Sequence, residues 1–111
     1  MSNLSQFNNA NLKFNKNQKF TFNNTSAQST AFDSETVAIY VTIRGSDMGG
    51  HIEIGSNPTA TSSSFRVQGE STNTLQKAPA PLFVAVDSGQ KLAAFQNTSN
   101  TMECYIMELK Y

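Results

Sequence analysis

The chain is 111 residues long, the size of one ordinary domain, with 38% hydrophobic and only 14% charged residues. Its 8 basic and 8 acidic residues cancel, which excludes the strong basic excess typical of a nucleic-acid-binding domain. The single cysteine excludes an intramolecular disulfide, and no apolar run approaches the ~18 residues of a membrane span. Because the first residues also lack a signal-peptide pattern, we expect a protein made in a cytoplasm, with neither membrane nor nucleic acid as a partner.

The N-terminal residues 1–11 are polar and rich in asparagine, with Leu4 and Phe7 isolated among them. So few apolar side chains cannot offset the conformational entropy lost when a segment is ordered. We therefore predict an extended polar arm over residues 1–11, followed by one domain over residues 12–111.

Aromatic and aliphatic residues alternate with polar ones at the start of the predicted domain. Leu12 and Phe14 form one such pair, Phe20 and Phe22 form another, and the polar residues 16–18 separate them. Pairing Phe14 with Phe20 places all four apolar side chains on one face. The spacing therefore predicts a β-hairpin with a three-residue loop.

The densest strand pattern covers residues 36–44, where β-branched residues alternate with polar or small ones. Four side chains fall on one face of this predicted strand: Val37, Ile39, Val41 and Ile43. The glycine-rich residues 45–50 indicate a loop, and residues 51–54 a returning strand with Ile52 and Ile54 pointing inward. We predict that the two strands form a hairpin.

The second half of the chain contains further short strand patterns. Phe65 and Val67 alternate with polar residues, and residues 82–86 form a continuous apolar run, which indicates a strand buried on both sides or at a subunit contact. The prolines just before this run suit an edge strand. Residues 91–96 and 102–109 then predict a hairpin.

About eight short strands, separated by turn signals and without a helical period, describe an all-β domain. The pattern predicts an antiparallel β-sandwich or a jelly-roll-like barrel, and it leaves the strand order open.

Residues with possible chemistry are sparse. His51 and Glu53 share one face of a strand, but metal sites and acid–base catalysis require more ligands or a positioned nucleophile, so we favour a structural role. Asp47 has no nearby acids that would complete a calcium site, and residues 49–50 resemble an anion-binding glycine loop only weakly. Cys104 alternates with apolar residues and is expected to be an inert core thiol. We expect neither an enzyme nor a cofactor or metal site.

Three tyrosines and two arginines suggest a different activity. Tyr40, Tyr105 and Tyr111, together with Arg44 and Arg66, have the side chains that stack on sugar rings in lectin-like grooves. Core or interface packing explains them as well.

Three segments of the chain resemble a recurrent pattern in small β-rich virion proteins of tailed bacteriophages. The first is residues 51–61 (HIEIGSNPTAT), the second is residues 81–93 (PLFVAVDSGQKLA), and the third is residues 104–109 (CYIMEL). The resemblance covers roughly residues 37–109, and the asparagine-rich segment before residue 35 lies outside it.

The resemblance implies a virion structural protein, and the small size and neutral polar surface suggest a capsid decoration or cement protein. Such a protein is expected to be made in the host cytoplasm, to form homo-oligomers, with a trimer favoured, and to bind the major capsid protein on the capsid surface. Five residues are the candidate capsid or subunit contacts: Leu4, Phe7, Lys13, Lys16 and Lys19. The alternative function is a receptor- or glycan-binding module of a phage head or tail fibre.

Overall fold

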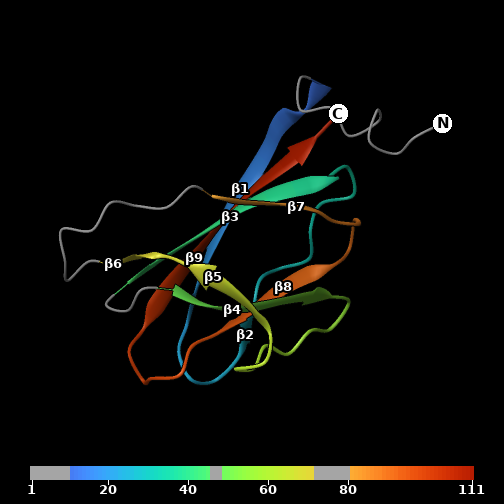
Figure 1. Cartoon of the computed structure of the whole chain (residues 1–111). Helices are drawn as coiled ribbons and strands as arrows, with labels where there is room; N and C mark the ends of the chain where they lie inside the picture. The colour runs from blue at the N-terminus through green and yellow to red at the C-terminus, as the bar shows by residue number, and fades with distance from the viewer. Residues whose placement is uncertain (1–10, 46–48, 72–80) are drawn as a thin grey trace.

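Two β-sheets face each other in the computed structural model, which describes residues 11–45, 49–71 and 81–111 (Figure 1). The strands are β1 (Lys13–Phe22), β2 (Ala27–Gln28), β3 (Ala38–Gly45), β4 (Gly49–Gly55), β5 (Phe65–Gln68), β6 (Glu70–Ser71), β7 (Leu82–Ala85), β8 (Lys91–Phe95) and β9 (Met102–Lys110). The predicted all-β antiparallel sandwich of about eight strands is confirmed. The predicted arm lies, except for its last residue, outside the described residues.

The first sheet has the order β1-β9-β3, and two short strands share the free edge of β3. β7 pairs with the first half of β3 and β6 with its last two residues. The second sheet has the order β2-β8-β4-β5. All these pairings are antiparallel except the two-residue contact between β3 and β6.

The predicted hairpin at the start of the domain is wrong, because β1 runs without a turn from Lys13 to Phe22 and pairs with β9. Phe14 lies opposite Leu109 and Phe20 opposite Cys104, with an irregularity in the register between Phe14 and Lys16. The long C-terminal strand offers hydrogen-bonding partners along the whole segment. A hairpin folded on itself would have left most of β9 without this neighbour.

The other two predicted hairpins are wrong for a common reason. β3 and β9 lie in the first sheet, whereas β4 and β8 lie in the second, so each connection crosses from one sheet to the other. Facing sheets lie about 10 Å apart, and a short polar connection rich in Gly, Ser and Asn spans that distance as readily as it forms a tight turn. Among the described strands, β4 and β5 are consecutive and do pair antiparallel.

The core lies between the sheets and contains three of the four side chains predicted for one face of residues 36–44; the fourth, Val37, precedes β3 and is half-buried. Ile39, Val41 and Ile43 are at most 2% exposed. Cys104 is buried between Met102 and Ile106 on β9, as predicted. Ile52 of β4 is buried as well, while Ile54 is half-buried at the edge of the core.

One side of the sandwich is covered by the segment 29–36, which we call the closing segment. The main-chain N–H of Ser29 donates to Leu92 O over 2.8 Å, and that of Phe32 donates to Gln90 O over 2.8 Å. The Phe32 ring is buried in the core. The closing segment therefore bridges the β1 side of the first sheet and β8 of the second.

Candidate binding surfaces

A buried carboxylate anchors the closing segment. Glu108 is 0% exposed and accepts hydrogen bonds from the Asp33 N–H at 2.9 Å, the Thr36 hydroxyl at 2.7 Å and the Gln18 amide at 3.0 Å. Lys16 Nζ lies 3.9 Å from the same carboxylate. Because hydrogen bonds and a cation compensate a buried charge, these contacts give Glu108 a structural role.

The role of Glu108 was not predicted from the sequence, although a signal was present. Strand alternation places residue 108 on the same face as Met102, Cys104 and Ile106, which point into the core. An acidic residue at an inward position predicts a buried polar network, because an uncompensated buried charge is too unfavourable to persist.

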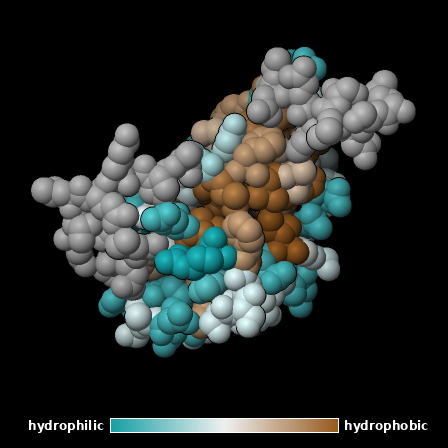
Figure 2. All heavy atoms as spheres, in the orientation of Figure 1, coloured by the Kyte–Doolittle hydropathy of each residue, from teal (hydrophilic) through white to brown (hydrophobic). Residues whose placement is uncertain are grey.

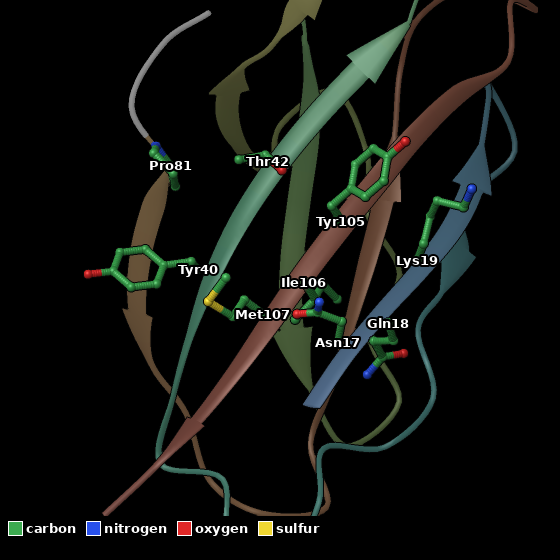
Figure 3. A pocket seen from close by; sticks show the side chains of 9 residues that line it. All are labelled: Asn17, Gln18, Lys19, Tyr40, Thr42, Pro81, Tyr105, Ile106 and Met107. Atoms are coloured by element: carbon green, nitrogen blue, oxygen red, sulfur yellow. The ribbon is translucent and has the colours of Figure 1, made fainter. Parts of the chain in front are cut away.

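The opposite, outward face of the first sheet has a shallow hollow of about 800 Å³ over β1, β9 and β3 (Figure 3). Its outward side chains include Asn17, Lys19, Tyr40, Thr42, Tyr105 and Met107. The strand register explains why they meet: Tyr40 lies opposite Met107, and Thr42 lies opposite Tyr105. Pairs on one face of neighbouring strands are in side-chain contact range.

The charges around Tyr105 compensate one another. The Tyr105 hydroxyl donates to Glu103 Oε1 over 2.9 Å, and Lys19 Nζ lies 3.5 Å from Glu103 Oε2. Lys19 Nζ is also 5.7 Å from the centre of the Tyr105 ring. The hydroxyl bond lowers the pKa of Glu103 and raises the pKa of Tyr105, because it favours the ionised carboxylate and the neutral phenol.

Two of the three tyrosines that were considered for stacking on sugar rings lie close together. Tyr40 and Tyr105 line the same hollow, and the Tyr40 ring packs 5.1 Å from the Phe83 ring of β7. Arg44 belongs to β3, whereas Arg66 belongs to β5 of the other sheet and Tyr111 follows the end of β9. Two of the three tyrosines therefore converge.

A second hollow opens between the sheets, on the side away from the closing segment. This apolar cleft of about 470 Å³ is lined mainly by Ile52, Ile54, Phe65, Leu82 and Val84. Phe65 is 63% exposed, and Figure 2 shows hydrophobic side chains gathered over this side, from β7 toward β4 and β5. Contiguous exposed apolar surface of this kind marks interaction sites in many proteins.

The apolar run at residues 82–86 forms one wall of this cleft. Leu82 and Val84 point inward and are half-buried, and Phe83 points outward onto Tyr40. Burial on both sides of this strand is wrong within one chain, because Leu82, Phe83 and Val84 are only half-buried and Ala85 is exposed. Among the described strands, β7 pairs with β3 alone. The position after Pro81 agrees with the predicted edge. The alternative, a subunit contact, stays a prediction.

His51 and Glu53 both contact Ser64. His51 Nδ1 lies 3.1 Å from the Ser64 carbonyl oxygen, and Glu53 accepts a 2.9 Å hydrogen bond from the Ser64 hydroxyl. Both side chains hold the β4–β5 connection. Within the described residues, no three His, Cys, Asp or Glu side chains are grouped to bind a metal ion.

The glycine pair at residues 49–50 begins β4 and serves packing. A side chain at Gly50 would place its Cβ 2.9 Å from the Phe22 ring and 2.9 Å from the Phe95 carbonyl oxygen. The neighbouring Arg66 guanidinium donates to the Val67 carbonyl at 2.8 Å. The prediction for Asp47 lies outside the described residues.

The thiol of Cys104 is fully buried in the core. Burial raises its pKa to about 12, so the reactive thiolate is scarce at neutral pH.

The candidate capsid contacts are only partly within the described residues, since Leu4 and Phe7 lie outside them. Lys13 is exposed at the start of β1. Lys16 and Lys19 approach Glu108 and Glu103, so intramolecular ion pairs compensate part of their charge.

The chain was compared with known protein families, proteins and structures. Neither a known family, a curated protein nor a solved structure matches this chain. In the part of the chain that the structure describes, no helix is long and apolar enough to cross a membrane. The apolar cleft and the outer hollow are candidate binding surfaces of the described residues.

Proposed function

We propose that this chain is a virion structural protein of a tailed bacteriophage, a capsid decoration protein that binds the major capsid protein on the mature head. The copies associate as homo-oligomers, with a trimer favoured. The resemblance of residues 51–61, 81–93 and 104–109 to small phage virion proteins motivates the identification. The apolar cleft supports the docking function, and it is the observation on which the proposal depends.

The cleft suits a contact with another protein. Its walls combine the exposed ring of Phe65 and half-buried aliphatic side chains with the outer edge of β7, and β7 pairs only with β3 among the described strands. An extended segment of a capsid protein can add to such an edge and insert alternate side chains into the cleft. A contact of this size is modest, but a symmetric oligomer on a repeated lattice multiplies modest contacts.

The proposal is tested by co-sedimentation of the purified chain with undecorated heads of the phage that encodes it. We expect saturable binding, and we expect the double variant Phe65→Ser, Val84→Ser to bind at least about tenfold more weakly, since about 1.4 kcal/mol of lost contact energy gives that factor. The control is Met107→Ser, a change at a 41% exposed position on the outer sheet face. Absence of binding by the unaltered chain would refute the proposal.

The predicted arm is tested with the same assay. Deletion of residues 2–11 is expected to abolish capsid binding and to leave the circular dichroism spectrum and thermal unfolding of the domain unchanged. Unchanged occupancy on the particles would exclude the arm and leave the cleft as the contact. Native mass spectrometry of the purified chain tests the trimer separately.

A further inference from the structure

The outer hollow contains two tyrosine rings held in fixed positions. Tyr40 lies opposite Met107 and Tyr105 lies opposite Thr42, so the two tyrosines are diagonal neighbours on β3 and β9. Such neighbours have Cα atoms about 7–8 Å apart. The Tyr105 hydroxyl is bonded to a neighbouring carboxylate, and Tyr40 packs against an aromatic ring. Rings that are already ordered lose little conformational entropy when a ligand binds.

Two cations on this face, among the described residues, are each paired with a carboxylate. Lys19 lies 3.5 Å from Glu103, and Arg44 Nε lies 3.8 Å from Glu70 Oε2. Each of these cations therefore has an acidic partner on the same face, which favours an uncharged ligand over an ionic one. The Asn17 amide and the Thr42 hydroxyl add neutral hydrogen-bonding groups to the lining.

We propose that the outer hollow binds an uncharged oligosaccharide, whose pyranose rings lie against Tyr40 and Tyr105 and whose hydroxyl groups hydrogen-bond to Asn17 and Thr42. A sugar ring presents apolar C–H faces and a polar rim, and tyrosine combines an apolar ring with a polar tip in the same way. The volume of about 800 Å³ falls within the range of about 300–1,000 Å³ usual for small-ligand sites.

A saccharide fits this hollow better than an extended peptide. The hollow lies over the middle of the sheet, where β9 pairs with β1 on one side and β3 on the other. The main-chain groups of β9 are therefore used within the sheet, and a peptide cannot add there as a further strand. The proposed sugar site does not depend on the capsid function.

The test is titration of the full chain with maltohexaose, cellohexaose, mannohexaose and laminarihexaose, followed by two-dimensional amide NMR. We expect at least one of them to bind with a Kd of about 1 mM or tighter. The shifted amides should cluster at the hollow residues of β1, β3 and β9. Tyrosine fluorescence gives a second readout, because the chain has 3 tyrosines and no tryptophan.

Three variants separate the hollow from the rest of the surface. Tyr105→Ala should weaken binding at least about tenfold, and Met107→Lys should do the same by filling the hollow with a charged chain. Met107 is 41% exposed, so the second variant keeps the fold even where the first loses stability. The control Tyr111→Ala, beyond the end of β9, should leave the Kd unchanged.

Several results would overturn the sugar site. These are the absence of binding by all four sugars, shifts that cluster elsewhere, or equal weakening by the Tyr111 control. Tighter binding of a proline-rich decapeptide or of sialyllactose at the same amides would instead assign the hollow to a peptide or an anionic ligand.

Discussion

The two sides of the sandwich differ in polarity and in how well they are covered. On the β1 side, the closing segment covers the gap between the sheets, and Glu108 holds it with hydrogen bonds inside the protein. On the β7 side, the described residues leave an apolar cleft of about 470 Å³, and Phe65 is 63% exposed. On the closed β1 side, the polar groups form their hydrogen bonds within the chain and need no partner protein. On the open β7 side, partly exposed apolar side chains would gain favourable free energy if a partner protein buried them. The closed side should therefore determine stability, and the open side should determine association.

The largest effect is expected from the removal of the buried carboxylate. Glu108→Ala leaves the Asp33 N–H and the Thr36 hydroxyl without their acceptor and removes one of the two acceptors of the Gln18 amide. It should lower the free energy of unfolding by about 3–5 kcal/mol. Urea denaturation measures the change. The control is Glu103→Ala on the outer face of the same strand, for which we expect a much smaller loss, because solvent screens the ion pair of Glu103 with Lys19. Equal losses would contradict the assignment of Glu108 to the closed side.

The next effect concerns Ser29, at the start of the closing segment. Its buried hydroxyl accepts a 2.9 Å hydrogen bond from the Leu92 N–H and donates over 2.9 Å to the Thr30 carbonyl. Ser29→Ala should lower the free energy of unfolding by about 1–2 kcal/mol, because a buried N–H loses its acceptor. The exposed Ser63 provides a control, since Ser63→Ala should change stability by no more than about 0.5 kcal/mol. A smaller loss at Ser29 than at Ser63 would show that the closing segment is dispensable.

Alternation along the sequence was sufficient to predict the class of fold and most of the inward face of β3, but not that of β1, where Phe14 is 57% exposed. Ile39, Val41 and Ile43 are buried as their spacing indicates, and so is Cys104. The pairing partners were not predictable in this way, and three proposed hairpins failed. Periodicity reports which face of a strand is apolar, but both sheets of a sandwich turn their apolar faces to one core. A connection between adjacent strands and a connection between sheets therefore carry the same sequence signal.

The candidate surfaces were not predictable either, because they depend on which strands are neighbours. Tyr40 and Tyr105 were selected by residue type, but their meeting depends on the register of β3 against β9. The apolar cleft combines residues of β4, β5 and β7 from both sheets, and no local pattern indicates that these strand edges lie together. Glu108 is the exception, because its inward position follows from alternation alone.

Two exposed phenylalanines allow the open side to be compared directly with the closed side. Phe65 lies in the cleft at 63% exposure, whereas Phe14 lies on β1 at 57% exposure. Phe65→Ser should strongly reduce the fluorescence of the hydrophobic dye ANS bound to the native protein, and Phe14→Ser should change it little. Each substitution should alter stability by less than about 1 kcal/mol, because neither ring is buried. Equal dye signals from the two variants would contradict the view that the cleft is the exposed apolar surface.

The smallest effect is expected in acid, and it should arise on the closed side. A hydrogen bond from the Asn15 amide at 3.2 Å, and then one from the Glu35 N–H, lower the pKa of Asp33 below its usual value of 3.8. Unfolding releases these bonds, so the unfolded chain takes up a proton at a higher pH than the folded chain does. The contribution of Asp33 to stability is therefore present above the unfolded pKa and is lost as the pH falls through the folded pKa.

Asn15→Ala should make the loss of stability between neutral pH and about pH 3 smaller than in the unaltered chain, as measured by urea midpoints. Asn17→Ala, two residues along β1 on the outer face, should leave that loss unchanged. The comparison requires each variant's own midpoint at neutral pH as its reference, because Asn15 also donates to the Thr36 hydroxyl at 3.0 Å and its removal affects stability at every pH. If the loss of stability between neutral pH and about pH 3 is the same in all three proteins, the closing segment does not respond to protonation of Asp33.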